Sequence, residues 1–230
     1  MGVAESKPDT LKQDGGRSSA KECKIVVVGL KSGEDSLTEL RWLPLEAHIL
    51  GTGSTIEELE SEKVPYRDAN VLLVTCGNSV SLAEIVKKMP NLLWIHSIFA
   101  GLDHIIYPDL ANDDHIIMSN AKGLFSSSLA EYVIAACSYF AKDFPRLMRQ
   151  KKEKKWEKYC VAELRGKTMG IIGYGDIGRA CAILAKAYGM RVIALRRRPQ
   201  LSSKDSLVDN IYGTDKICDV FADSDYLVVA

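Results

Sequence analysis

Short apolar runs alternate with amphipathic segments along the first half of the chain. The run CKIVVVGL (23–30) is rich in β-branched residues, which predicts a buried strand. Further apolar runs predict strands at 47–50, 70–77, 91–97 and 115–120. Because these runs are continuously apolar and do not alternate with polar residues, we expect their sheet to be covered on both faces.

Helices are predicted between these strands. The stretch STIEELESE (54–62) starts with serine and threonine as possible N-caps. A second helix is predicted at 81–90, with Ser81 as its N-cap and Pro90 as its stop. Strands that alternate with helices in this way are joined by crossovers and run parallel.

The pattern changes near residue 125. Residues 127–157 carry a long helical pattern that begins densely apolar, passes Pro145 and becomes strongly basic. Proline lacks an amide hydrogen, so Pro145 is expected to kink or break this helix. We interpret the basic segment RQKKEKKWEK (149–158) as a solvated helix face and not as a nucleic-acid surface, because only Trp156 interrupts its polar residues.

A glycine motif follows this helix. Gly173, Gly175 and Gly178 form G-x-G-x-x-G between the apolar strand at 169–172 and an alanine-rich helix that ends near Gly189. In such a turn the first glycine permits a sharp bend, the second lets a pyrophosphate approach the backbone, and the third lets the helix pack on the strand. The motif therefore predicts a dinucleotide-binding turn.

The residues around the glycines complete this predicted site. Tyr174 lies within the turn, and the amides of Asp176 and Ile177 open the helix, where the positive end of the helix dipole favours phosphate.

The next strand, RVIAL (191–195), ends at three arginines. Arg196 lies 18 residues after Gly178, where an NAD-binding fold normally has an acid that accepts from the ribose 2′-hydroxyl. Arginine cannot accept, but it pairs with a 2′-phosphate. We therefore favour NADP(H), with NAD(H) as the alternative, and expect Arg196 and Arg197 as contacts while Arg198 points away. The other interpretation is a solvated basic turn before Pro199, with a cofactor of either kind held by its pyrophosphate.

Composition narrows the function further. The chain has 230 residues, no net charge and 47% hydrophobic residues, which gives no support to nucleic acid or a membrane surface as the main partner. No apolar run reaches the roughly 18 residues of a membrane span. The six cysteines are scattered, so we expect reduced thiols in a cytoplasmic protein and no metal site. The start MGVAES fits an N-myristoylation pattern at Gly2, although a plain flexible tail is favoured.

The order of these parts resembles the D-isomer-specific 2-hydroxyacid dehydrogenase family, in its glyoxylate/hydroxypyruvate reductase-like members. The resemblance is carried by SIFAGLDHI (97–105), SNAKGLFSSSLAEYV (119–133), LRGKTMGIIGYGDIGR (164–179) and DSDYLVVA (223–230). It implies an α/β fold with a flavodoxin-like N-terminal lobe, followed by a partial Rossmann-type doubly wound dinucleotide-binding domain. The expected division is a disordered tail at 1–21, an incomplete substrate-binding lobe at 22–125 and a truncated NAD(P)-binding domain at 126–230.

The resemblance also implies site residues and an activity. The turn at Ala100 and Gly101 matches the loop whose amides receive the substrate carboxylate, and Cys76 and Gly77 match a second such loop. The implied reaction is hydride transfer between NAD(P)H and a small 2-keto or 2-hydroxy acid, such as glyoxylate or hydroxypyruvate. For His104, beside this loop, a structural hydrogen bond is favoured over a catalytic role.

Two further expectations follow from the resemblance. The family's catalytic arginine, glutamate and histidine come after the strand that DSDYLVVA matches, and only three of about six strands are recognisable from residue 168 onward. We therefore expect a C-terminally truncated chain without catalytic residues and without turnover on its own. The full-length protein is expected to be a homodimer, with the helix near 127–144 contributing. The alternative function is a non-catalytic dinucleotide-sensing module like the family's corepressors.

Overall fold

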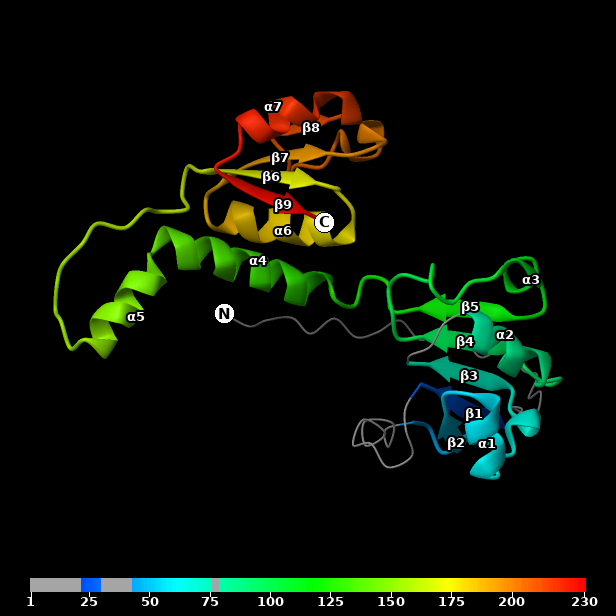
Figure 1. Cartoon of the computed structure of the whole chain (residues 1–230). Coiled ribbons are helices and arrows are strands. Elements are labelled where there is room, and N and C mark those ends of the chain that lie inside the picture. The colour runs from blue at the N-terminus through cyan, green and yellow to red at the C-terminus, as the bar shows by residue number, and fades with distance from the viewer. Residues whose placement is uncertain (1–21, 30–42, 76–78) are drawn as a thin grey trace, which may run out of the picture. The chain divides into compact units, whose positions relative to one another are not determined.

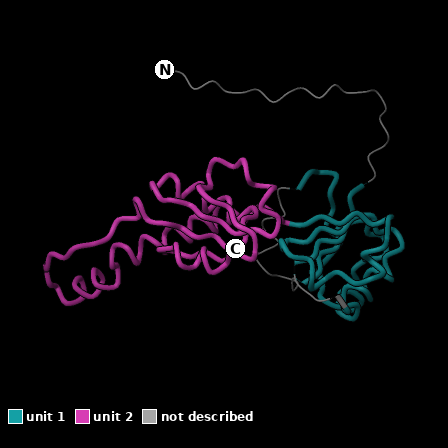
Figure 2. The backbone as a smooth tube through the Cα atoms, turned by 90° about the horizontal axis from the view of Figure 1, so that it is seen from above, with its two compact units in different colours: residues 1–120 teal, residues 121–230 magenta. Residues whose placement is uncertain are grey.

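A computed structural model of the chain describes residues 22–29, 43–75 and 79–230. The expected tail at 1–21, including Gly2, lies outside these residues, as do Cys76 and Gly77. The chain divides into two compact units, Met1–Asn120 and Ala121–Ala230, which Figure 2 distinguishes by colour.

The first unit contains a parallel sheet of five strands in the order β2-β1-β3-β4-β5. The strands are β1 (Cys23–Val28), β2 (Ala47–Gly53), β3 (Val71–Val74), β4 (Trp94–Ser97) and β5 (Ile117–Asn120). This is the strand order of flavodoxin-like folds. The predicted lobe of parallel strands is therefore confirmed (Figure 1).

The first sheet buries its centre on both faces. Val26, Val28 and Leu72 join one cluster with side chains of the helices α1 (Ile56–Ser61) and α2 (Ser79–Lys87). The alternate positions Ile25, Val27 and Val71 form a smaller cluster, because successive side chains of a strand point to opposite faces.

The two predicted helices of this lobe form, with one difference at a cap. Thr55 caps α1 by accepting a hydrogen bond from the Glu58 amide at 3.3 Å. The prediction of Ser81 as the N-cap of the second helix was wrong, because α2 already begins at Ser79 and Ser81 lies inside it. A 3₁₀ turn, η2 (Tyr66–Asp68), and the single-turn helix α3 (Pro108–Ala111) were not predicted, since each is too short to show a period.

The second unit contains a parallel sheet in the order β8-β7-β6-β9. Its strands are β6 (Thr168–Ile172), β7 (Arg191–Leu195), β8 (Asn210–Tyr212) and β9 (Tyr226–Val229). In the numbering of a Rossmann-type sheet this is the order 3-2-1-4, the first four of its six strands. The prediction of three strands from residue 168 onward was wrong. The fourth strand, β8, has only three residues and does not form an apolar run in the sequence.

Helices cover both faces of this second sheet. The helix α6 (Asp176–Ala187) and the longer α4 (Ser126–Ala141) lie on one side, and α7 (Ile217–Ala222) lies on the other (Figure 1). Val192 and Ala194 of β7 pack in the cluster of α4 and α6, whereas Ile193 and Leu195 pack with Val220 of α7. The continuously apolar sequence of β7 is thus explained by burial on both faces.

The long helical segment is broken, but not at the proline. Helix α4 ends at Ala141, and α5 (Phe144–Lys152) begins after two intervening residues, with Pro145 in its first turn. Asp143 has a φ of 48° and caps α5 by accepting from the Arg146 amide at 3.3 Å. A proline is tolerated in a first turn, where its missing amide hydrogen would have no helical acceptor. In the described part of the chain, no helix is long and apolar enough to cross a membrane.

Candidate dinucleotide-binding site

The glycine turn joins the end of β6 to the start of α6. Gly173 has a φ of 96°, in the left-handed region that glycine alone adopts readily. Its amide donates to the Leu195 carbonyl at 3.0 Å, so the turn remains tied to the neighbouring strand β7 as it bends. The backbone therefore requires glycine at this position.

Gly178 lies where α6 approaches the strand most closely. A Cβ atom at this position would lie 2.5 Å from the Gly173 carbonyl oxygen and 3.0 Å from Cγ2 of Ile171. Real Cβ atoms do not approach backbone so closely, and the helix would have to move away from β6. The third glycine therefore allows the close packing of helix on strand that the sequence predicted.

Gly175 differs from the other two glycines. It is the N-cap of α6, with the extended values φ −105° and ψ −150°, and a Cβ atom built there would meet no described atom within 4 Å. Neither the fold nor the backbone conformation requires glycine here. What glycine provides is open space directly before the first amides of the helix.

Those amides are available to a ligand. The first intrahelical bond runs from the Arg179 amide to the Gly175 carbonyl at 2.9 Å, and amides before it in a helix have no intrahelical acceptor. Asp176 and Ile177 contribute two of them. Because α6 is 12 residues long, its dipole adds a positive potential at this end.

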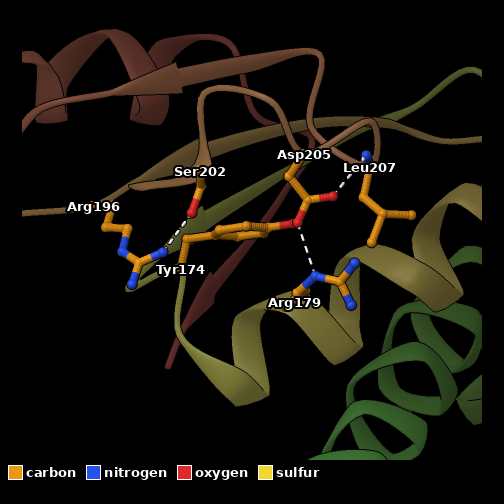
Figure 3. A network of polar contacts seen from close by, with 6 residues as sticks. All are labelled: Tyr174, Arg179, Arg196, Ser202, Asp205 and Leu207. Atoms are coloured by element: carbon orange, nitrogen blue, oxygen red, sulfur yellow. Dashed lines mark hydrogen bonds and ion pairs between the residues drawn. The ribbon is translucent and has the colours of Figure 1, made fainter. Parts of the chain in front are cut away.

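A polar network holds the glycine turn against the segment that follows β7 (Figure 3). The Tyr174 hydroxyl donates to Oδ2 of Asp205 at 3.1 Å, and Nε of Arg179 donates to the same oxygen at 2.8 Å. The other oxygen, Oδ1, accepts from the Leu207 amide at 3.2 Å. One carboxylate therefore connects the turn, the helix α6 and the chain before β8.

The network shifts the pKa values of its members in opposite directions. Burial and the hydrogen bond to Asp205 raise the pKa of the Tyr174 hydroxyl well above its usual range. Burial alone would raise the pKa of Asp205, but the hydrogen bonds from Leu207, Arg179 and Tyr174 outweigh it and hold that pKa below its usual value. Asp205 is therefore ionised and Tyr174 neutral near pH 7.

Replacing Asp205 by asparagine is expected to lower the free energy of unfolding at pH 7 by about 1–2 kcal/mol, because charge-assisted hydrogen bonds are lost. The folded-state pKa of Asp205 is depressed, so its contribution is present above the ordinary carboxyl pKa and is lost as pH falls through the folded-state value. Thermal unfolding of both proteins between pH 7 and pH 3 measures this. A stability difference that stays constant down to pH 3 would contradict the assignment.

The arginines after β7 differ in their surroundings. Arg196 is half-buried, its amide donates to the Tyr212 carbonyl at 3.0 Å, and its Nη1 donates to the Ser202 hydroxyl (Figure 3). Arg197 and Arg198 are exposed. Of the three cations at this strand end, Arg196 is the one whose orientation the surrounding structure defines.

The residues expected to receive a substrate carboxylate belong to the first unit. Ala100 and Gly101 are exposed and follow β4, and the Ala100 carbonyl accepts from the Asn120 side chain at 2.7 Å. The pairing of β4 with β5 brings these two segments together. The ring of His104 packs edge-on against Phe99, with 5.0 Å between the ring centroids.

Four residues of these two regions were not predicted from the sequence as site residues: Arg179, Ser202, Asp205 and Asn120. The only local signal was the polar run SSKD (202–205), which indicates a turn. Tyr174 and Asp205 are separated by 31 residues, and no local pattern indicates that such residues meet.

Comparisons with known proteins agree with this geometry. Residues 134–230 match the model of the family described as "D-isomer specific 2-hydroxyacid dehydrogenase, NAD binding domain". The chain is 36% identical to a D-3-phosphoglycerate dehydrogenase of Archaeoglobus fulgidus over 74% of its own length and 31% of the relative's. It is 35% identical to a hydroxypyruvate reductase of Thermotoga maritima over 61% of its length and 46% of the relative's.

A solved structure extends the likeness to the fold. The glycerate dehydrogenase related protein of Thermoplasma acidophilum matches with a TM-score of 0.58 and 27% identity, covering 90% of this chain and 64% of that one. The chain therefore spans less than half of these two curated relatives and about two thirds of this structure.

The second unit is a Rossmann-type dinucleotide-binding domain, as its strand order, its glycine turn and the matched family model together indicate. The matched family model identifies residues 134–230, most of this unit, as similar to the NAD-binding domain of the D-isomer-specific 2-hydroxyacid dehydrogenase family, and the curated relatives agree with it. The family resemblance inferred from the sequence is confirmed.

Proposed function

We propose that the glycine turn of the second unit binds the pyrophosphate of a nicotinamide dinucleotide. The observation that carries this proposal is the open space at Gly175, which a Cβ atom would fill although nothing in the fold requires it to be empty. The amides of Asp176 and Ile177 face a phosphate placed there, and Gly173 and Gly178 allow the turn and the packing that bring helix and strand together.

The preferred cofactor in this proposal is NADP(H), with NAD(H) as the weaker ligand. Arg196 lies at the end of β7, where the ribose edge of a dinucleotide is held in this fold. Its guanidinium can pair with a 2′-phosphate through charge-assisted hydrogen bonds, and Arg197 is close enough in sequence to add a second cation. The nearby Asp205 already accepts from three donors, which leaves it poorly suited to accept from a ribose hydroxyl.

The activity we propose for the whole protein is hydride transfer between NAD(P)H and a small 2-keto or 2-hydroxy acid. A bound nicotinamide supplies or takes up the hydride. In this chain the exposed turn at Ala100 and Gly101 offers backbone amides to the substrate carboxylate, and we assign Cys76 and Gly77 to a second such loop. The matched relatives include a hydroxypyruvate reductase, which supports a substrate of that size.

Titration of the 230-residue chain with NADPH and with NADH, followed by nicotinamide fluorescence, tests the cofactor proposal. We expect saturable binding of both, with the lower dissociation constant for NADPH. Equal constants would remove the preference for NADP(H), and no saturable binding of either would overturn the proposal.

We further propose that the protein forms a homodimer through helices α4 and α5. At their junction, Tyr139 contacts Phe140 and stacks on Phe144, with 5.9 Å between the centroids of the stacked pair. Phe140 is 71% exposed, and Tyr132 on the same helix is 75% exposed. Such a row of exposed aromatic side chains is typical of a protein–protein interface.

Replacing Phe140 by aspartate is expected to convert the dimer to a monomer, because a carboxylate would be buried unpaired in the interface. Light scattering coupled to size-exclusion chromatography measures the mass. The matched control is Leu45→Asp, which places the same charge at an apolar residue of the first unit that is 93% exposed. A monomeric wild type, or a variant that remains dimeric, would contradict the interface.

A further inference from the structure

Among the described residues, Ser202 is the one that accepts a hydrogen bond from the side chain of Arg196. Its backbone is held beside β8 by the bond from its amide to the Tyr212 carbonyl. Beyond the backbone, Nη1 donates to the hydroxyl oxygen of Ser202 (Figure 3). Ser202 is 7% exposed, so this hydrogen bond is largely shielded from water.

Ser202 is itself held in place by the polar network of the glycine turn. It ends the 3₁₀ helix η3 (Pro199–Ser202), and its carbonyl accepts from the Asp205 amide at 3.1 Å. Asp205 is bound through its carboxylate to Tyr174 and Arg179. The short segment from Ser202 to Asp205 thus links the guanidinium of Arg196 to the turn proposed to bind the pyrophosphate.

This connection has a consequence for ligand recognition. A guanidinium carries five N–H donors, and Ser202 accepts from one nitrogen, Nη1, so donors remain for a phosphate. An arginine side chain loses rotamer freedom when it is immobilised, and this loss opposes binding. An arginine that is oriented before the ligand arrives has already lost part of that freedom, and the ligand binds correspondingly more tightly.

We propose that Ser202 is a positioning residue that sets the preference for a 2′-phosphorylated dinucleotide by orienting Arg196. The proposal rests on the proposed function, because it presupposes a dinucleotide with its ribose edge at Arg196. Ser202 acts only through Arg196. Its effect is therefore confined to ligands that carry the 2′-phosphate.

The test compares Ser202→Ala with Ser203→Ala in the 230-residue chain. Ser203 is the matched control, because it is exposed and its hydroxyl donates to the Gln200 carbonyl at 3.1 Å, away from Arg196. Calorimetric titration uses two probes that differ only in the phosphate of interest, 2′,5′-ADP and 5′-AMP. We expect Ser202→Ala to weaken 2′,5′-ADP by about fivefold to tenfold and 5′-AMP by less than about twofold, which is the size of effect expected for one ordinary hydrogen bond. Ser203→Ala should leave both affinities unchanged.

A rescue variant separates positioning from general damage to the fold. Ser202→Thr retains the hydroxyl and should recover most of the affinity for 2′,5′-ADP. If Ser202 had a purely structural role, the affinities for 2′,5′-ADP and 5′-AMP would instead fall and recover together. An equal loss of both probes in Ser202→Ala would overturn the inference, and so would unchanged affinity for 2′,5′-ADP.

The wild-type protein distinguishes this failure from failure of the proposed function. If it binds NADPH more tightly than NADH while Ser202→Ala keeps the same ratio, only the role of Ser202 is wrong. If it binds neither dinucleotide, the proposed function and the inference fail together. If it binds both equally, the proposed dinucleotide site is retained, but Arg196 does not recognise a 2′-phosphate and Ser202 does not position it.

Discussion

Replacing Gly175 by serine is expected to weaken dinucleotide binding at least tenfold, by about 1.4 kcal/mol or more, while the protein stays as stable as the wild type. A Cβ atom at this position meets no described atom within 4 Å, and its extended backbone accepts any residue. Serine is also a preferred N-cap, so α6 loses nothing. The added side chain, however, fills the space before the helix, and its hydroxyl competes for the amides offered to the phosphate.

The variant to compare with it is Gly178→Ala, which lies in the same helix, directly after the residues whose amides are offered to the phosphate. Its Cβ atom would clash with the Gly173 carbonyl and with Ile171, so we expect a loss of about 1–3 kcal/mol in the free energy of unfolding, typical of overpacking. Thermal unfolding and NADPH titration of both variants separate the two effects. The proposed site would be wrong if Gly175→Ser bound NADPH as tightly as the wild type.

Replacing Arg196 by aspartate is expected to raise the dissociation constant for NADPH about a hundredfold and to change that for NADH by less than about threefold. The variant loses charge-assisted hydrogen bonds, each worth about 1.5–3 kcal/mol, and places a carboxylate next to the 2′-phosphate. NADH has no phosphate there, so neither effect applies to it. Fluorescence titration with both dinucleotides measures the two constants.

Arg198→Asp is the control for this experiment. It makes the same change in charge two residues away, at an exposed side chain that precedes η3. A general electrostatic effect on a polyanionic ligand would weaken NADPH similarly in both variants. Unchanged NADPH affinity in Arg196→Asp would remove Arg196 from the site and return the choice of cofactor to the alternative, NAD(H).

Elements with a clear apolar run or a clear amphipathic period were predictable from the sequence. The strand RVIAL coincides with β7 (Arg191–Leu195), because burial on both faces makes the whole strand apolar. The helix after the glycine turn was equally clear, since it is amphipathic and ends before Gly189, whose φ is 71°. Strand β8, in contrast, has three residues and is defined by its pairing with β7, which no local pattern records.

The position of Pro145 illustrates the same limit. Proline in a helical pattern predicts an interruption, and the interruption exists, but Asp143 with its left-handed backbone and its capping carboxylate decides where the second helix begins. Proline excludes conformations for the residues around it. It does not select which of the remaining boundaries gives the better caps.

The sequence by itself determined the glycine turn and the location of Arg196. Both follow from local geometry: the three glycines act within a few residues of one another, and a helix and a strand of known length carry the chain from Gly178 to the ribose edge. Only the tertiary structure decided what surrounds that arginine. Ser202 and Asp205 acquire their roles because the chain after β7 folds back onto the glycine turn. Hydrogen bonds between residues brought together in this way depend on distances in space, which the order of residues along the chain does not specify.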